Sequence, residues 1–129
     1  MKEIDVVCGA ILKDGKYLIA KRAKGVDEGF WEFAGGKVEK NESNVDAIKR
    51  ELKEELDIDV NVIQYICSVD DIRKDITLHV HAYLCEIKEG SIQLHVHDEY
   101  KWVEARDLYQ FKFQEADKKI LDEINKIVV

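Results

Sequence analysis

Residues 50–55 read RELKEE and place three carboxylates, Glu51, Glu54 and Glu55, close together in a chain with a formal net charge of −7. Like charges this close on a helix repel each other. Carboxylate oxygens are ligands that Mg²⁺ takes, and Mg²⁺ often bridges to the phosphates of a substrate. The glutamates are therefore candidate metal ligands. A solvated helix flank held by ion pairs four residues apart explains them equally well on the helix pattern by itself.

A helix over residues 43–56 would position these side chains. Ser43 followed by Asp46 is typical of a capping box, with Asp in place of the usual Glu. The three glutamates share an arc of roughly 100° on the helical wheel, beside an apolar arc of roughly 80°. We therefore expect the carboxylates to border the packed face. The apolar arc contains Val45, Ile48, Leu52 and Leu56.

The residues before this helix strengthen the metal hypothesis. Gly35 and Gly36 end a predicted strand, and a glycine pair permits the close approach of backbone to a ligand or ion. Glu42 lies eight residues before Arg50, close enough to form a charge-assisted hydrogen bond across the loop. Such a bond would fix the loop that precedes the glutamates.

Residues 36–58 resemble the Nudix box: Gly, five residues, Glu, seven residues, Arg-Glu, an aliphatic residue, any residue, Glu-Glu, any residue, Gly and an aliphatic residue. One position departs from the pattern, because Asp57 stands where the family has Gly. Asp tolerates the left-handed conformation expected there, so we expect a small stability cost and unchanged chemistry. The matching residues are Gly36, Glu42, Arg50, Glu51, Leu52, Glu54, Glu55 and Ile58.

The resemblance extends over nearly the whole chain. WEFAGGK at 31–37 is similar to the WEFPGGK of MutT-type members, which cleave nucleoside triphosphates. It implies an α+β fold, the Nudix α/β/α sandwich with a mixed sheet. It implies a Mg²⁺ site, with Mn²⁺ as a possible substitute, formed by Glu51, Glu54, Glu55 and the Gly35 carbonyl. Arg50 would orient the glutamates with Glu42 as its partner.

The same resemblance implies a substrate site. Arg22 and Lys37 would contact phosphates, although both also fit solvated strand-end charges. Ile4, Val6, Phe33 and Val80 would line a base pocket, with Phe33 stacked on the base; all four also fit a core role. Asp117 would bind the base edge, and the helix dipole would favour its ionised form, which accepts hydrogen bonds from an amine such as that of cytosine. A protonated Asp117 would suit a purine edge instead. The alternative is an acid at a helix end.

One acid of the family pattern is missing. Many MutT-type members carry a Glu just before the histidine of a late loop, where this chain has Val96. Asp98 or Glu99 could substitute for it. The four histidines, His79, His81, His95 and His97, are expected to face solvent or line a pocket rather than bind zinc, because no thiolate motif accompanies them.

The remaining patterns predict strands around two helices. Because strands and helices do not alternate regularly, a mixed sheet with helices packed on it fits better than a doubly wound fold. A closing helix is expected over 114–127. The strands are expected at 4–13, 17–22, 31–36, 60–69, 76–87, 91–96 and 100–105, with a turn at Asp14-Gly15.

Composition sets the outer limits. The 129 residues predict a single domain over 1–129, and 46% hydrophobic residues suffice for a core. The acidic balance argues against a nucleic-acid polymer or an anionic membrane as partner, and no apolar run approaches the roughly 20 residues of a membrane span. Three isolated cysteines indicate reduced thiols in the cytoplasm. A monomer or homodimer is expected.

Together these features predict Mg²⁺-dependent hydrolysis of a nucleoside triphosphate to its monophosphate and pyrophosphate. CTP-type and oxidised substrates such as 8-oxo-dGTP are the candidates. The alternatives are a hydrolase of another nucleoside diphosphate derivative, such as ADP-ribose, and a non-catalytic nucleotide-sensing module. The three intact glutamates argue against the sensing module.

Overall fold

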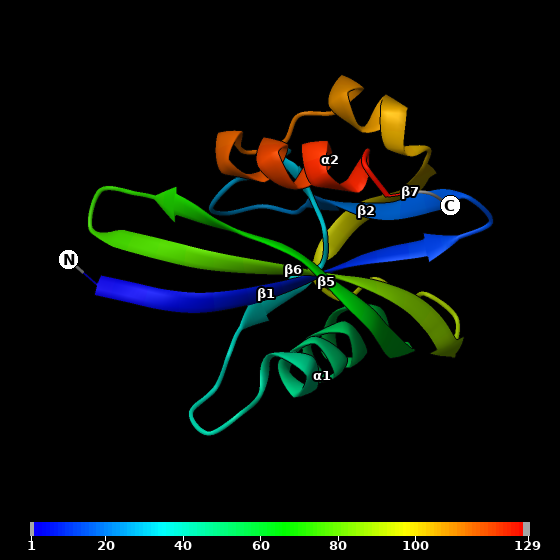
Figure 1. Ribbon diagram of the computed structural model, residues 1–129, viewed down its shortest axis with the longest axis horizontal. Helices are drawn as coiled ribbons and strands as arrows, with labels where there is room; N and C mark the ends of the chain where they lie inside the picture. The colour runs from blue at the N-terminus through cyan, green and yellow to red at the C-terminus, as the bar shows by residue number, and fades with distance from the viewer. Residues whose placement is uncertain (1, 128–129) are drawn as a thin grey trace.

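The computed structural model describes residues 2–127 and shows a twisted sheet with helices on both faces (Figure 1). The helices are α1 (Asn44–Leu56) and α2 (Lys118–Ile124), with 3₁₀ helices at Ala105–Gln110 and Glu115–Asp117. The strands are β1 (Lys2–Lys13), β2 (Lys16–Arg22), β3 (Trp31–Glu32), β4 (Gly35–Lys37), β5 (Asp59–Ile72), β6 (Ile76–Glu89) and β7 (His97–Val103). No helix within residues 2–127 is long and apolar enough to span a membrane.

The sheet is mixed, as predicted. Its main order is β3-β2-β1-β6-β5, while β4 pairs with β1 and β7 pairs with β2. The β1–β6 pair is parallel and runs from Lys2 opposite Ile76 to Ile11 opposite Cys85. The other strand pairs of the described chain are antiparallel.

Two apolar clusters fill the two sides of the sheet and give the expected α/β/α sandwich. Figure 1 shows α1 on one face and α2 on the other. Alternation along β6 divides its side chains, so that Val80, Ala82 and Leu84 pack toward α2 while Cys85 packs toward α1. The helices are thus fixed on the sheet by burial.

Helix α1 begins and ends as its sequence predicts. Ser43 Oγ accepts a hydrogen bond from the backbone N–H of Asp46 at 3.1 Å. Asp57 adopts the left-handed conformation (φ 60°, ψ 34°), and its N–H donates to the Lys53 carbonyl at 3.0 Å.

The prediction that Val45 belongs to the packed face of α1 was wrong, because Val45 is 37% exposed. The buried face extends instead to Ala47, on the glutamate side of the helix, and this draws the carboxylates toward the sheet.

Three element predictions were wrong. Residues 91–96 form no strand, because their backbone bonds the end of α1: Gln93 N–H donates to the Leu56 carbonyl and His95 N–H to that of Glu55. The segment 31–36 is split between β3, which pairs with β2, and β4, which pairs with β1.

The closing helix is also shorter than 114–127. It starts as a 3₁₀ turn at Glu115–Asp117 and becomes α-helical only from Lys118 to Ile124. Asn125 Nδ2 donates to the Leu121 carbonyl at 2.8 Å and to the Ala105 carbonyl at 3.0 Å. This side chain bonds helix carbonyls at the point where the helix ends.

Candidate active site

The glutamates of α1 meet the glycine pair of β4. The Gly35 N–H donates to Glu55 Oε1 at 3.3 Å. A Cβ on Gly36 would lie 2.5 Å from the Glu51 carboxyl carbon, so a side chain there would displace the carboxylate. Gly36 is therefore required by the close approach of a helix side chain, and Gly35 by the close approach of the β1 backbone at Val7 and Cys8.

Arg50 is the centre of the charge network. Its Nε and Nη2 donate to the two carboxylate oxygens of Glu42 at 2.8 and 2.9 Å, which confirms the predicted pair. Nη1 donates to Glu51 at 2.8 Å and to Glu54 at 3.4 Å. Nη2 also donates to the Lys37 carbonyl at 2.9 Å. One guanidinium thus ties the loop, the strand and two glutamates together.

The charge network also lowers the pKa of Glu42, the acidic residue of the loop before α1. The hydrogen bond from Arg50 lowers the pKa of Glu42 to about 2, with a smaller contribution from the backbone N–H of Glu39. Glu42 therefore remains ionised, and remains a partner for Arg50, down to strongly acidic pH.

We expect Arg50→Met to lower the melting temperature by about 5 °C or more, because it leaves the Glu42 and Glu51 carboxylates without their main cationic partner. Arg50→Lys should recover only part of the loss, since an ammonium cannot reproduce the bidentate fork. Arg106→Met is the matched control, because the Arg106 side chain is 81% exposed and contacts only Glu104 among the described ion pairs. Thermal unfolding of the three variants checks this; equal melting temperatures for Arg50→Met and Arg106→Met would contradict it.

Glu55 lies in the most buried part of the glutamate cluster. Burial raises its pKa to about 7; the charges of Glu32 and Glu51 add to the rise, while His97 and the Gly35 N–H oppose it. A nearby cation would favour the ionised form of such a carboxylate. The electrostatics at this position therefore suit a bound divalent ion.

The donor chemistry also fits a hard cation. Within residues 2–127, no three His, Cys, Asp or Glu side chains already surround one metal position. However, Glu51 and Glu55 both reach the Gly35–Gly36 pair, and Glu54 lies one residue before Glu55 with its side chain 59% exposed. Carboxylate and backbone carbonyl oxygens are the ligands that Mg²⁺ and Mn²⁺ prefer. The residues present thus fit the expected metal.

A cavity of about 660 Å³ runs from the glycine pair toward the 3₁₀ turn before α2. Its lining includes Gly35, Gly36, Lys37, Arg22 and Asp117. Phe33 lines the cavity and is supported by the Phe113 ring, 5.6 Å away between centroids. Val6, Val80 and Cys8 complete the apolar wall, whereas Ile4 does not line it. The cavity therefore brings together six of the seven residues predicted for the substrate site, namely Val6, Arg22, Phe33, Lys37, Val80 and Asp117.

Asp117 differs from its predicted state. Burial raises its pKa to about 7, and nearby charged side chains act on this pKa as well. The expectation that the helix dipole favours the ionised form was therefore wrong, because burial outweighs the dipole of a short helix and favours the protonated form. Asp117 lies at the start of α2, as the helix-end alternative expects, but its side chain makes no capping hydrogen bond there. Glu32, Asp71 and Asp27 raise this pKa, and Arg73 lowers it.

An ion pair on the wall of this cavity was not predicted from the sequence. Arg73 donates to Asp27 at 2.9 Å and to Asp71 at 2.8 Å. Arg73 and Asp27 both line the cavity. Arg73 and Asp27 are 46 positions apart in the sequence, and no sequence motif predicts that they pair.

The histidines were expected to face solvent or to line a pocket, and for His97 the first of these expectations was wrong. Its side chain is only 1% exposed, and Nε2 lies 2.8 Å from Glu32 Oε2, so it does not face solvent. His79 and His81 remain half-buried and bond acidic side chains. Glu99, a candidate for the missing acid, pairs with Lys21 and Lys101, and Val96 is 51% exposed.

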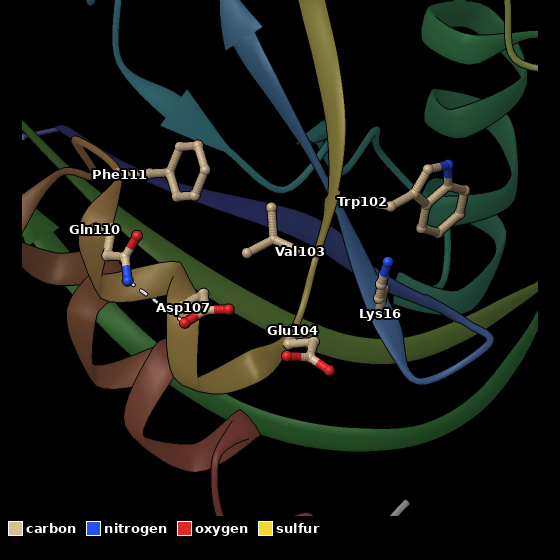
Figure 2. Close-up of a pocket in the computed structure, with 7 residues that line it drawn as sticks. All are labelled: Lys16, Trp102, Val103, Glu104, Asp107, Gln110 and Phe111. Carbon is tan, nitrogen blue, oxygen red and sulfur yellow. Dashed lines mark hydrogen bonds between the residues drawn. The ribbon is translucent and has the colours of Figure 1, made fainter.

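A second hollow lies between β2, β7 and the 3₁₀ helix at 105–110 (Figure 2). Lysine, acidic and aromatic side chains share its surface, and Gln110 donates to Asp107 at 3.4 Å. None of the predicted site residues lines it, so it does not compete with the main cavity as the nucleotide site. Figure 2 shows Lys16, Trp102, Val103, Glu104, Asp107, Gln110 and Phe111 around it.

Comparisons with known proteins agree with this geometry. A family model described as the NUDIX domain matches residues 3–124. A CTP pyrophosphohydrolase of Escherichia coli K12 is 39% identical over 95% of this chain and 91% of its own length. An 8-oxo-dGTP diphosphatase of Buchnera aphidicola is 32% identical over 99% and 98%. The solution structure of the E. coli ORF135 protein superposes with a TM-score of 0.85 at 37% identity, covering 98% of this chain and 91% of that one.

Proposed function

The chain belongs to the Nudix hydrolase family, and on that premise we propose that it hydrolyses a nucleoside triphosphate to the monophosphate and pyrophosphate with Mg²⁺ or Mn²⁺. One observation carries the proposal. A single cavity joins the Gly35–Gly36 pair, where Glu51 and Glu55 converge, to a wall that contains Phe33 and Asp117. In this proposal the triphosphate binds beside the glycine pair, and the base contacts Phe33 and Asp117 on the wall of the same cavity.

The residues divide the work of such a reaction. When bound, the divalent ion neutralises phosphate charge and lowers the pKa of a bound water. Glu51, Glu54, Glu55 and the Gly35 carbonyl would hold the ion. Arg50 and Glu42 keep two of the glutamates in place through the bonds described above. Arg22 and Lys37 both line the cavity and would bind phosphate oxygens.

Phe33 and Asp117 would select the base. Phe33 offers a ring face for stacking, and Val80 contributes apolar wall. The names of the two relatives point to CTP-type or oxidised guanine nucleotides, and we propose the same two candidate classes here. The bases of both classes carry an exocyclic amine that could donate a hydrogen bond to Asp117.

The Asp117 assignment predicts a pH-dependent base preference. Below about pH 7 the protonated carboxyl both donates and accepts, whereas above it the carboxylate only accepts. The carboxylate should favour the amine of cytosine and oppose the O4 carbonyl of uracil. An unpaired buried acceptor costs about 1–3 kcal/mol, or about five- to 150-fold in rate. The ratio of kcat/KM for CTP to that for UTP should therefore rise at least about fivefold from pH 6 to pH 8.

Asp117→Asn is the matched control for this prediction, because its amide donates and accepts at every pH in that range. Its CTP-to-UTP ratio should stay constant with pH. A wild-type ratio that is also constant would remove Asp117 from base recognition.

Two other functions are compatible with this fold: hydrolysis of ADP-ribose and nucleotide sensing without turnover. A hydrolase of ADP-ribose would use the same glutamates, with a second ribose in place of the terminal phosphates. A sensing module would bind nucleotide without turnover. The networked Arg50 and its glutamates favour a hydrolase, because binding by itself does not require this charge arrangement.

The test is a substrate panel of CTP, dCTP, 8-oxo-dGTP and ADP-ribose, assayed for product formation with Mg²⁺. We expect a triphosphate to have the highest kcat/KM. A preference for ADP-ribose would establish the first alternative, and saturable binding without turnover of any panel member would establish the second.

We further propose that the chain forms a single domain that acts in the cytoplasm. Cys8, Cys67 and Cys85 are unpaired in the described structure, which suits a reducing compartment.

A further inference from the structure

His97 occupies an unusual position at the start of β7. Its side chain is 1% exposed, although it belongs to a segment whose neighbours Val96 and Asp98 are exposed. The register between β2 and β7 shifts at this point: Lys21 lies opposite Glu99, but Arg22 lies opposite His97. The bulge therefore leaves Asp98 unpaired and turns His97 inward.

The imidazole makes one side-chain hydrogen bond within the described part of the chain. Its Nε2 lies 2.8 Å from Glu32 Oε2, while Nδ1 is buried and has no hydrogen-bond partner among the described residues. Nε2–H is thus the donor, and the carboxylate of Glu32 accepts. Burial fixes the ring, so the direction of this hydrogen bond is fixed as well.

Glu32 transmits that constraint to the cavity. Its oxygens also accept from Arg22 Nη1 at 3.3 and 3.4 Å, and Glu32 and Arg22 both line the cavity. Arg22 Nε is held on its other side by the Val26 carbonyl at 3.2 Å. A chain of contacts therefore runs from buried His97 through Glu32 to Arg22 at the phosphate end.

We propose that His97 is a positioning residue: it fixes the Glu32 carboxylate, which orients the Arg22 guanidinium toward the substrate phosphates. This inference rests on the proposed function. Arg22 is 41% exposed on its side chain and can adopt many rotamers. A carboxylate fixed by His97 restricts them before the substrate arrives, which lowers the cost of binding.

The test compares two substitutions at this position. His97→Leu removes the donor and keeps an apolar side chain, whereas His97→Gln keeps an N–H near the position of Nε2. We expect His97→Leu to raise KM for the preferred triphosphate about tenfold, with kcat changed less than about threefold, because the contact acts on phosphate binding. His97→Gln should restore KM to within about threefold of wild type. His95→Leu is the matched control, because His95 is exposed and lies two residues away.

A purely structural role predicts a different result. Both variants would then lose melting temperature and active fraction together, and KM would not change; that outcome overturns the proposal, as does a KM for His97→Gln as high as that for His97→Leu. If His97→Leu does not fold, Glu32→Gln carries the test. The amide removes the negative charge that attracts the Arg22 guanidinium and replaces one acceptor oxygen with an NH₂ donor, so KM should rise about tenfold, and a wild-type KM overturns the proposal.

Separate results would contradict the proposed hydrolysis and the proposed role of His97. If the wild-type protein turns over no triphosphate, the proposed function fails. If it does and His97→Leu keeps the wild-type KM, only the role of His97 fails.

Discussion

Replacing Glu54 with glutamine is expected to lower the rate of triphosphate hydrolysis by about a hundredfold or more, with little change in melting temperature. The substitution keeps the shape of the side chain and removes a charge that would hold a cationic metal, and losing a main electrostatic stabiliser typically costs this much. The fold depends little on Glu54, whose side chain is 59% exposed and whose contact with Arg50 is long, at 3.4 Å. Removing one of three neighbouring negative charges also relieves repulsion.

Glu123→Gln is the matched control for this prediction. Glu123 is also a helical glutamate paired with a nearby cation, Lys126, at 2.7 Å, but it lies on the opposite face of the sheet from α1. It should keep wild-type kcat. If Glu54→Gln also keeps wild-type kcat at saturating Mg²⁺, the metal-ligand interpretation is contradicted, and the glutamates are explained as a solvated helix flank.

Removing divalent ions is expected to abolish turnover. Glu51, Glu54 and Glu55 add negative charge at the end of the cavity where phosphates would lie, so a substrate that is itself anionic needs cations there. Excess chelator should stop hydrolysis, and added Mg²⁺ or Mn²⁺ should restore it. Activity that persists in excess chelator contradicts the metal assignment.

A second readout separates metal binding from catalysis. An ion that binds only the folded state stabilises it, by about 2.7 kcal/mol at a concentration a hundred times its Kd. Mg²⁺ should therefore raise the melting temperature of the wild type and raise that of Glu54→Gln less. An equal shift in both proteins would place the ion elsewhere.

The parts of the site carried by local patterns could be predicted from the sequence. Ser43 and Asp57 bound α1 as expected, because capping depends on residues within a few positions of one another. The pairing of Glu42 with Arg50 was equally accessible, since a short loop limits where the two side chains can go. The mixed sheet followed from the irregular order of strands and helices.

The parts set by distant segments could not be predicted. The inward turn of His97 results from a register shift against β2, which the alternation of β7 does not reveal. Arg73 meets Asp27 only because two loops fold toward the same cavity. The segment at 91–96 has an alternating pattern, yet its N–H groups bond the end of α1 instead of a strand. Burial, which no local pattern gives, decides the protonation of Asp117.

Product analysis is the most direct test of the central claim. The preferred triphosphate is incubated with the protein and Mg²⁺, and the phosphorus-containing products are identified by chromatography and by separate assays for pyrophosphate and orthophosphate. We expect equal amounts of nucleoside monophosphate and pyrophosphate, with orthophosphate at background. Nucleoside diphosphate and orthophosphate in equal amounts would contradict the claim, because they would show cleavage at the terminal phosphate.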